Sequence, residues 1–169
     1  MKPLSISPVD LVLRVAAATV GACESPGGSN AGPYVDRVLR LVGHNPGQPW
    51  CAAHLAGVGS AALRKDWPAP KTAGCQALFD WAMRMDIVSD DPEPGDIFLI
   101  WRPELRRFAH TGFCIAPLED GRWTTNSGNT TSKAKPADPT KAREGWLVEE
   151  KPWRFRDADR FARWATLLR

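Results

Sequence analysis

The sequence lacks paired cysteines, a long hydrophobic run and a strong excess of charge. Its four cysteines lie far apart, without a CxxC pair or a Cys/His cluster at metal-ligand spacing, which argues against a zinc site. A chain of 169 residues can bury a core without a disulfide framework, so free thiols are expected. A net charge of +3 suits weak attraction to anionic surfaces but is too small for a nucleic-acid-binding protein.

The VGAC stretch at 20–23 resembles a lipoprotein cleavage box. Asp10 and Arg14 interrupt the apolar stretch before it, which argues against a signal peptide. A helix with Ser7 as its N-cap is the better interpretation, because apolar residues recur at the spacing of one buried face. These residues are Val9, Val12, Leu13, Ala16, Ala17 and Val20. The sequence therefore predicts no signal peptide and no transmembrane span.

Apolar residues at helical spacing predict three more helices in the first half of the chain. The second helix is expected to stop at Gly43, the third to run from near Cys51 to about Leu63, and the fourth to cover about 72–85. The apolar positions of the second and fourth helices are Val35, Val38, Leu39, Val42, Cys75, Leu78, Phe79 and Ala82.

The second half of the chain changes to strand patterns. Strands are predicted at 97–101, 110–116, 122–126 and 145–153. Asp120-Gly121 favours a hairpin turn, 132–144 is expected to be a surface loop, and 156–169 a final short helix. Helices first and antiparallel strands second predict an α+β fold, as a single domain over 1–169.

Cys51 follows Pro49 and Trp50 directly and opens the third predicted helix. Cysteine is nucleophilic as the thiolate, and a helix N-terminus or a nearby imidazole lowers its pKa. A buried small hydrophobic residue is the other interpretation of these residues alone. Cys75, on an apolar helix face, and Cys114, within a strand, are expected in the core.

A cysteine nucleophile needs an imidazole partner, and the chain has three histidines. His44 is expected in a solvated loop. His54 lies one helical turn after Cys51, a position that rarely suits the in-line geometry of nucleophile, base and carbonyl; groove lining and core packing both stay open for it. His110 begins a predicted strand, where a rigid backbone can present an imidazole to a neighbouring helix terminus. His110 is therefore the favoured base.

A third group should accept the other N–H of the catalytic imidazole. The run TTNSGNTT at the end of the next strand offers Asn126 and Asn129 for this role, although with Gly128 they are equally typical of a turn. Trp50 and Trp101 could shape a substrate groove, but a tryptophan next to a strand more often packs in the core.

Five short motifs follow one another along the chain and together suggest a known family. They are GGSNAGPYVDRVLRLVG, PWCAA, EPGDIFLIW, AHTGFCI and NSGNT. Their order and spacing resemble the CHAP family of cysteine peptidases and amidases, close to the NlpC/P60 proteins, over roughly residues 20–150. The resemblance implies a papain-like fold, with N-terminal helices packed on a small antiparallel sheet. It also implies hydrolysis of amide bonds in peptidoglycan peptides, with Cys51 as the nucleophile and His110 as the base.

The resemblance places the third catalytic group on the strand after His110. Many relatives carry a Glu-Gly-Asn-like run there, whereas this chain has Ser127, Gly128 and Asn129. The missing Glu leaves Asn126 or Asn129 to orient the imidazole, and Asn126 is favoured. A neutral Asn can hold the tautomer, so this departure is compatible with activity.

The implied mechanism begins with attack of the Cys51 thiolate on a carbonyl carbon. The backbone N–H of Cys51 would stabilise the oxyanion, with Gln48 as a candidate side-chain donor. His54 is the second departure, because relatives with PWCAAF carry an aromatic residue at its position. The clustered acidic residues of the family's calcium sites are missing, so we expect no metal and no cofactor.

The first functional hypothesis is a phage or bacterial cell-wall hydrolase, an amidase or endopeptidase acting on peptidoglycan. It would be made in the cytoplasm and reach the cell wall or periplasm after lysis or export by another system. An interbacterial amidase toxin with an immunity protein is the second hypothesis. A catalytically silent module that binds peptidoglycan or serves in assembly is the third, supported by the missing Glu and by His54. We expect a monomer without nucleic-acid or membrane partners.

Overall fold

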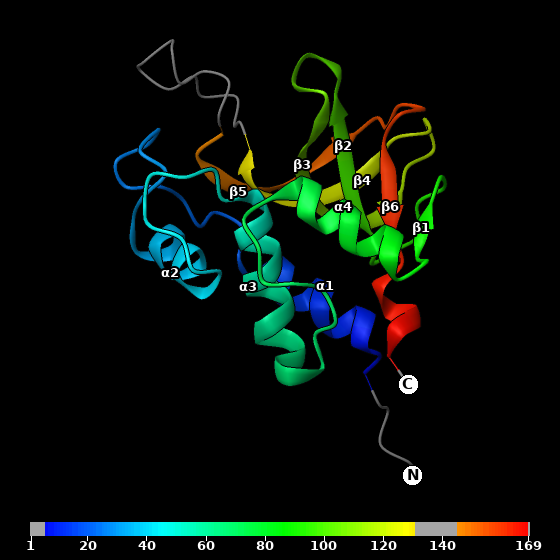
Figure 1. Cartoon of the computed structure of the whole chain (residues 1–169), viewed down its shortest axis with the longest axis horizontal. Coiled ribbons are helices and arrows are strands. Elements are labelled where there is room, and N and C mark those ends of the chain that lie inside the picture. The colour runs from blue at the N-terminus through cyan, green and yellow to red at the C-terminus, as the bar shows by residue number, and fades with distance from the viewer. Residues whose placement is uncertain (1–5, 131–144, 169) are drawn as a thin grey trace.

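A computed structural model describes residues 6–130 and 145–168 of the chain (Figure 1). Within these ranges the four α-helices are α1 (Pro8–Ala18), α2 (Pro33–Leu41), α3 (Cys51–Leu63) and α4 (Cys75–Arg84). The strands are β1 (Val88–Ser89), β2 (Ile97–Arg102), β3 (Arg107–Pro117), β4 (Trp123–Thr130), β5 (Leu147–Trp153) and β6 (Arg160–Ala162). Short 3₁₀ helices are η1 (Arg64–Asp66), η2 (Pro103–Leu105) and η4 (Trp164–Leu167).

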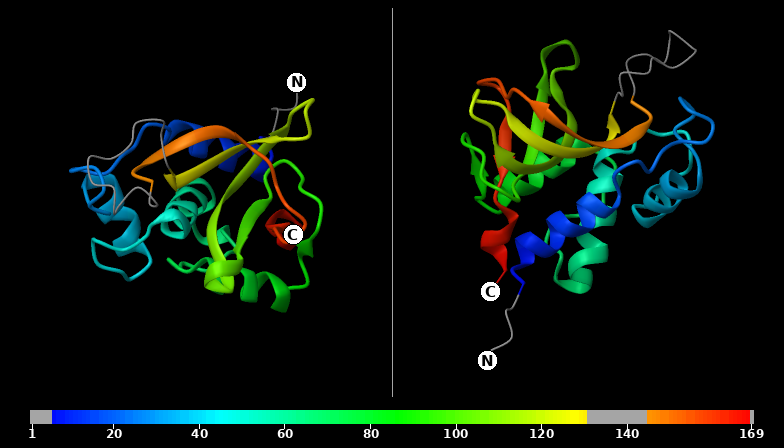
Figure 2. Two further views of the ribbon diagram at one scale, coloured as in Figure 1. Left: turned by 90° about the horizontal axis from the view of Figure 1, so that it is seen from above. Right: turned by 180° about the vertical axis from the view of Figure 1, so that it is seen from behind.

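The strands form one antiparallel sheet in the order β1-β6-β2-β3-β4-β5. Helices α1 and α3 lie together on one side of this sheet, and α2 lies outside α3, at the periphery (Figure 2). In the register, Ile100 of β2 is opposite His110 of β3, and Phe113 of β3 is opposite Asn126 of β4. The structure confirms the predicted α+β organisation, with helices first and antiparallel strands second.

Helix α3 is the central helix of the fold. It packs against α1, α2, β3 and β4, and most of its residues are buried. Small side chains make this possible, because neighbours approach the helix closely. A Cβ atom on Gly57 would lie 2.8 Å from Val38 of α2, and one on Gly59 would lie 2.2 Å from the ring of Trp67. Larger residues at these positions would separate α3 from its neighbours.

Alternation along the strands divides the apolar side chains of the sheet between two cores. The face toward the helices contributes Ile97, Leu99 and Phe113 to the main core, which includes buried residues of α1, α3 and α4. A second cluster consists of Phe98, Ile100, Cys114 and Phe161, with the rings of Trp123, Trp153 and Phe155 packed against it. Cys114 is therefore a core residue, as predicted.

Most predicted elements are confirmed. Helix α3 begins at Cys51 and ends at Leu63, as the pattern indicates, and the Ser7 hydroxyl caps α1 by accepting from the Asp10 N–H at 3.0 Å. The expected buried face of α1 is too long, since Ala17 is exposed and Val20 lies beyond the helix, 48% exposed. The predicted surface loop at 132–144 lies outside the described residues.

The prediction of a C-terminal helix over 156–169 is wrong for its first part. Residues Arg160–Ala162 form β6, which inserts between β1 and β2 and pairs with both. The apolar side chains of Phe161 and Ala162 are buried by these strands. Only Trp164–Leu167 forms a short 3₁₀ helix. Pairing with strands far away in the sequence overrides the local helical pattern.

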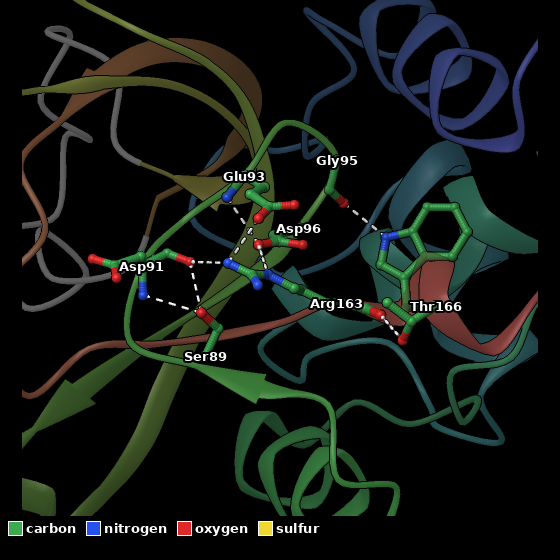
Figure 3. A network of polar contacts seen from close by, with 8 residues as sticks. Ser89, Asp91, Glu93, Gly95, Asp96, Arg163 and Thr166 are labelled. Atoms are coloured by element: carbon green, nitrogen blue, oxygen red, sulfur yellow. Dashed lines mark hydrogen bonds and ion pairs between the residues drawn. The ribbon is translucent and has the colours of Figure 1, made fainter.

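Arg163, directly after β6, ties the C-terminal segment to the loop before β2 (Figure 3). Its guanidinium donates to the Asp91 carbonyl at 3.2 Å and pairs with Glu93 at 2.9 Å and Asp96 at 3.7 Å. The neighbouring Trp164 indole donates to the Gly95 carbonyl at 2.7 Å. Burial is the largest influence on the Asp96 carboxyl group and raises its pKa to about 6, although Arg163 and the Glu93 N–H act in the opposite direction.

The raised pKa of Asp96 predicts a pH-dependent stability. The folded state holds the proton up to a higher pH than the unfolded state, so this contribution is complete below about pH 4 and is lost as the pH rises through 6. We expect the unfolding free energy of Asp96→Asn to rise relative to wild type by about 2 kcal/mol between pH 4 and pH 7. Denaturant titrations at several pH values measure this difference. Glu93→Gln, which changes an exposed partner of Arg163, is the control and should show little of this pH-dependent change in unfolding free energy.

Candidate active site

Cys51 is the first residue of α3, and its side chain is only 4% exposed. The preceding residue, Trp50, is the N-cap of the helix and is fully buried. Its indole N–H donates to the Glu24 carboxylate at 2.9 Å, which holds the start of α3 against the loop after α1. Because Cys51 is the first residue of α3, its sulfur lies near the unpaired N–H groups of the helix start, which favour negative charge. Of the two alternatives open for Trp50, core packing is confirmed.

Cys75 lies beside Cys51, a contact that the sequence analysis did not predict. It is the first residue of α4, and the distance between the two Sγ atoms is 3.6 Å. Burial in the main core agrees with its predicted apolar environment. The sequence contains one relevant signal, because both cysteines open apolar helices. Their separation of 24 positions along the chain gives no indication that these two helix starts meet.

His110 lies in β3, opposite Ile100 of β2. Its Nε2 atom is 3.3 Å from the Ser127 hydroxyl of β4. The rings of Phe98 and Trp153 pack around it, with centroids 5.8 and 6.1 Å from the imidazole. A hydroxyl group and aromatic rings thus restrict the orientation of His110 on an otherwise rigid strand.

The surroundings of Cys51 lower its pKa well below the usual range of a thiol. Hydrogen bonding from the Cys75 thiol is the largest cause, and burial opposes it by disfavouring the charged sulfur. His110 lies close enough that both hydrogen bonding and its charge favour the thiolate, and the Ala52 N–H adds a smaller effect. Cys75 is correspondingly held as the thiol, because its hydrogen bond to Cys51 raises its pKa well above the usual range.

His54 is fully buried, which decides between its two alternatives in favour of core packing. Its Nε2 atom is 3.0 Å from Asn126 Oδ1 and its Nδ1 atom is 2.7 Å from the Tyr34 hydroxyl. The Asn126 amide nitrogen donates to the Ala16 carbonyl at 3.1 Å, which leaves its oxygen to accept from His54. His54 is therefore the neutral Nε2–H tautomer and accepts from Tyr34. Burial lowers its pKa to about 4, in agreement with a neutral ring.

The structure corrects the expected role of Asn126. Both ends of its amide are used by His54 and Ala16, on the side of β4 that faces the helices. The next residue, Ser127, is the one whose side chain contacts His110. Neighbouring strand residues point to opposite faces, so Asn126 faces the helices and Ser127 is the residue of β4 that contacts His110.

Asn129 also has hydrogen-bond partners other than His110. With the amide oriented to satisfy both of its ends, Asn129 accepts from the Trp50 N–H at 3.3 Å and donates to the Gly145 carbonyl. This residue, at a φ of +52°, connects the end of β4 to the start of α3. Gln48 lies exposed in the loop before α3, three residues from Cys51.

Gly128 allows β4 to approach α3. A Cβ atom at this position would lie 2.5 Å from the Trp50 ring and 2.7 Å from the Cβ of His54. Such contacts are shorter than side chains tolerate, so any larger residue would separate the strand from the helix that carries Cys51. The glycine of the NSGNT motif therefore has a packing role here and is not a turn residue, since it lies within β4.

Comparisons of the chain with protein-family models, with curated proteins and with solved structures found no match. Among the residues that the structure describes, no group of three or more His, Cys, Asp or Glu side chains could hold a metal ion. None of the helices in the described ranges is long and apolar enough to cross a membrane. The CHAP resemblance therefore remains a prediction from the motifs, to be weighed with the geometry of the site.

The His54–Asn126 hydrogen bond predicts that alanine substitutions at two neighbouring positions of β4 lower the free energy of unfolding by different amounts. Asn126→Ala leaves the His54 Nε2–H without an acceptor in the core, whereas the Ala16 carbonyl still accepts from Thr19, and should lower the unfolding free energy by about 2 kcal/mol. Ser127→Ala removes one longer hydrogen bond and should cost about 1 kcal/mol or less. Urea denaturation of both variants gives the comparison. Equal losses would contradict the assignment of the buried network to Asn126.

The contacts of Cys51 predict its reactivity. Its alkylation by iodoacetamide should reach half of the maximal rate well below pH 8.5, the ordinary value for a thiol, whereas buried Cys114 stays unreactive. In Cys75→Ala the hydrogen-bond donor is lost, and the rate profile of Cys51 should move to higher pH. Peptide mass spectrometry after timed alkylation separates the four thiols. A profile that is ordinary in both proteins would refute the assigned environment.

Proposed function

We propose that this protein is a cysteine amidohydrolase that cleaves amide bonds in peptidoglycan peptides. The observation that carries the proposal is the environment of Cys51, whose sulfur lies at the start of α3 and is favoured as the thiolate by both Cys75 and His110. A purely structural cysteine in an apolar core has the opposite tendency, as the raised pKa of Cys114 illustrates. The substrate class comes from the resemblance of the motifs to CHAP proteins.

In the proposed mechanism, the Cys51 thiolate attacks the carbonyl carbon of the scissile amide. The backbone N–H of Cys51 stabilises the oxyanion, with Gln48 as a further donor. His110, which has taken the proton of the Cys51 thiol, gives it to the leaving amine as the C–N bond breaks and a thioester remains. His110 then takes a proton from water, which attacks the thioester; the C–S bond breaks, the acid leaves and the Cys51 sulfur is restored. Ser127 holds Nε2 of His110, so Nδ1 is the nitrogen available for these transfers.

Ser127 takes the positioning role that the resemblance gives to a Glu or Asn. A hydroxyl group can accept the Nε2–H of His110 and so favour the Nε2–H tautomer, but it carries no negative charge. The imidazolium formed during catalysis is thus stabilised less than in an enzyme with a carboxylate at this position. We infer that hydrolysis is slower than in relatives with a Glu.

One positive charge beside the site agrees with a peptidoglycan substrate. Arg107 is exposed at the start of β3 and is close enough to act electrostatically on Cys75. The stem peptides of peptidoglycan carry several free carboxylates. A cation at this position would favour their approach to Cys51.

The test is hydrolysis of purified peptidoglycan by the whole chain. Wild type should release new amino groups, whereas Cys51→Ala and His110→Ala should lose at least about a thousandfold in rate, because both groups take part in the chemical steps. Cys23→Ser, at an exposed cysteine, is the matched control and should retain the wild-type rate. Mass spectrometry of the released fragments distinguishes cleavage at the lactyl-alanine junction from cleavage within the peptide.

Two results would overturn the proposal. Equal release by wild type and Cys51→Ala would show that the cysteine is not the nucleophile. Sedimentation of the folded wild-type protein with peptidoglycan, without any release of amines, would instead support the catalytically silent binding module. Circular dichroism of each variant confirms that a lost rate does not come from unfolding.

A further inference from the structure

The two buried sulfurs of Cys51 and Cys75 lie closer together than the hydrolytic mechanism requires. At 3.6 Å they are in van der Waals contact, and each belongs to the first residue of its helix. The structure describes all four cysteines, and none of them forms a disulfide. Cys114 lies in the separate cluster with Phe98, and Cys23 is exposed after α1. One pair of thiols is thus arranged to react together.

We propose that Cys51 and Cys75 form a reversible disulfide that switches off the site, with a hydroperoxide as the oxidant. The cross-link itself depends only on the two thiols. Its effect on activity rests on the proposed function, in which Cys51 is the nucleophile.

The chemistry has two steps. The Cys51 thiolate attacks one oxygen of the hydroperoxide, an S–O bond forms and the O–O bond breaks; the oxygen that leaves takes a proton, and Cys51 becomes a sulfenic acid. The Cys75 sulfur then attacks the Cys51 sulfur, an S–S bond forms and the S–O bond breaks. The departing hydroxide leaves as water with the Cys75 proton. The two thiols lose two electrons and two hydrogens in total, and an added dithiol reverses the change.

The two cysteines have different roles in these two reaction steps. Cys51 is the thiolate and therefore the group that reacts with peroxide, whereas Cys75 stays protonated and close. A disulfide needs an S–S distance of about 2 Å, so the sulfurs must approach by roughly 1.5 Å. Both cysteines are at helix starts, where a side-chain rotation changes no hydrogen bond within the helices. Cys75 is thus the resolving thiol, which captures the sulfenic acid before it is oxidised further.

Oxidation of the whole reduced chain with hydrogen peroxide tests the cross-link directly. The intact mass should fall by two hydrogens, and a proteolytic digest without reductant should contain the Cys51 peptide joined to the Cys75 peptide. Dithiothreitol should restore both free thiols. Detection of Cys51 as a sulfinic acid, with Cys75 still a free thiol, would overturn the proposal, as would a cross-link that involves Cys23 or Cys114.

A Cys75→Ser variant tests the resolving role. Without the second thiol, peroxide should convert Cys51 to sulfinic and sulfonic acids, which dithiothreitol does not reduce. Cys114→Ser is the matched control, since it removes a buried cysteine that lies outside the pair. This control should form the Cys51–Cys75 cross-link to the wild-type extent. Full recovery of the Cys51 thiol by dithiothreitol in Cys75→Ser would contradict the proposal.

The mass measurements are independent of hydrolysis. If peptidoglycan is not cleaved but the cross-link forms and reverses, the proposed function fails and the dithiol proposal stands. If peptidoglycan is cleaved, peroxide should abolish the rate of wild type and dithiothreitol should restore it. A rate that survives complete formation of the disulfide would show that Cys51 is not needed as a free thiol.

Discussion

The hydrogen bond between His54 and Asn126 is the contact on which the geometry of the site depends. His54 is three residues after Cys51 on α3, and Asn126 directly precedes Ser127 on β4. Ser127 in turn contacts His110. This 3.0 Å bond therefore connects the helix that carries Cys51 to the sheet that carries His110. A shift of β4 by one residue would break this bond and would also move Ser127 away from His110.

The same bond belongs to a polar chain that runs through the core, from Tyr34 of α2 through His54 and Asn126 to the Ala16 carbonyl of α1. Each hydrogen-bond donor on this path from Tyr34 to the Ala16 carbonyl has an acceptor. Buried polar groups that are satisfied in this way favour one arrangement of the elements that carry them. These hydrogen bonds suit a neutral His54 beside Cys51, where burial lowers the pKa of His54 to about 4. Two imidazoles near one sulfur thus have separate tasks. His54 links the helix to β4 through Asn126, whereas His110 contacts Ser127.

Local patterns were sufficient to predict the four α-helices and strands β2 to β5, but not strands β1 and β6 or the side-chain contacts around Cys51. The start of α3 at Cys51 follows from the residues around it, and the strand that carries His110 follows from the apolar pattern of 110–116. Asn126 and Ser127 could not be distinguished, because the face of each depends on the register between β3 and β4. Strand β6 and the contact of Cys75 with Cys51 both join segments distant in sequence. Periodicity contains no information on such pairings.

The contact of Cys75 with Cys51 is common to the proposed hydrolysis and the proposed disulfide. The hydrogen bond from its thiol is the largest influence that stabilises the Cys51 thiolate, in a buried position where charge is otherwise disfavoured. A serine hydroxyl could supply a similar bond, but a thiol brings a second consequence. Because the thiolate is also the form that reacts with peroxide, the contact that activates Cys51 also places a reductant next to it. Activation and protection of the nucleophile then have the same structural origin, the meeting of two helix starts.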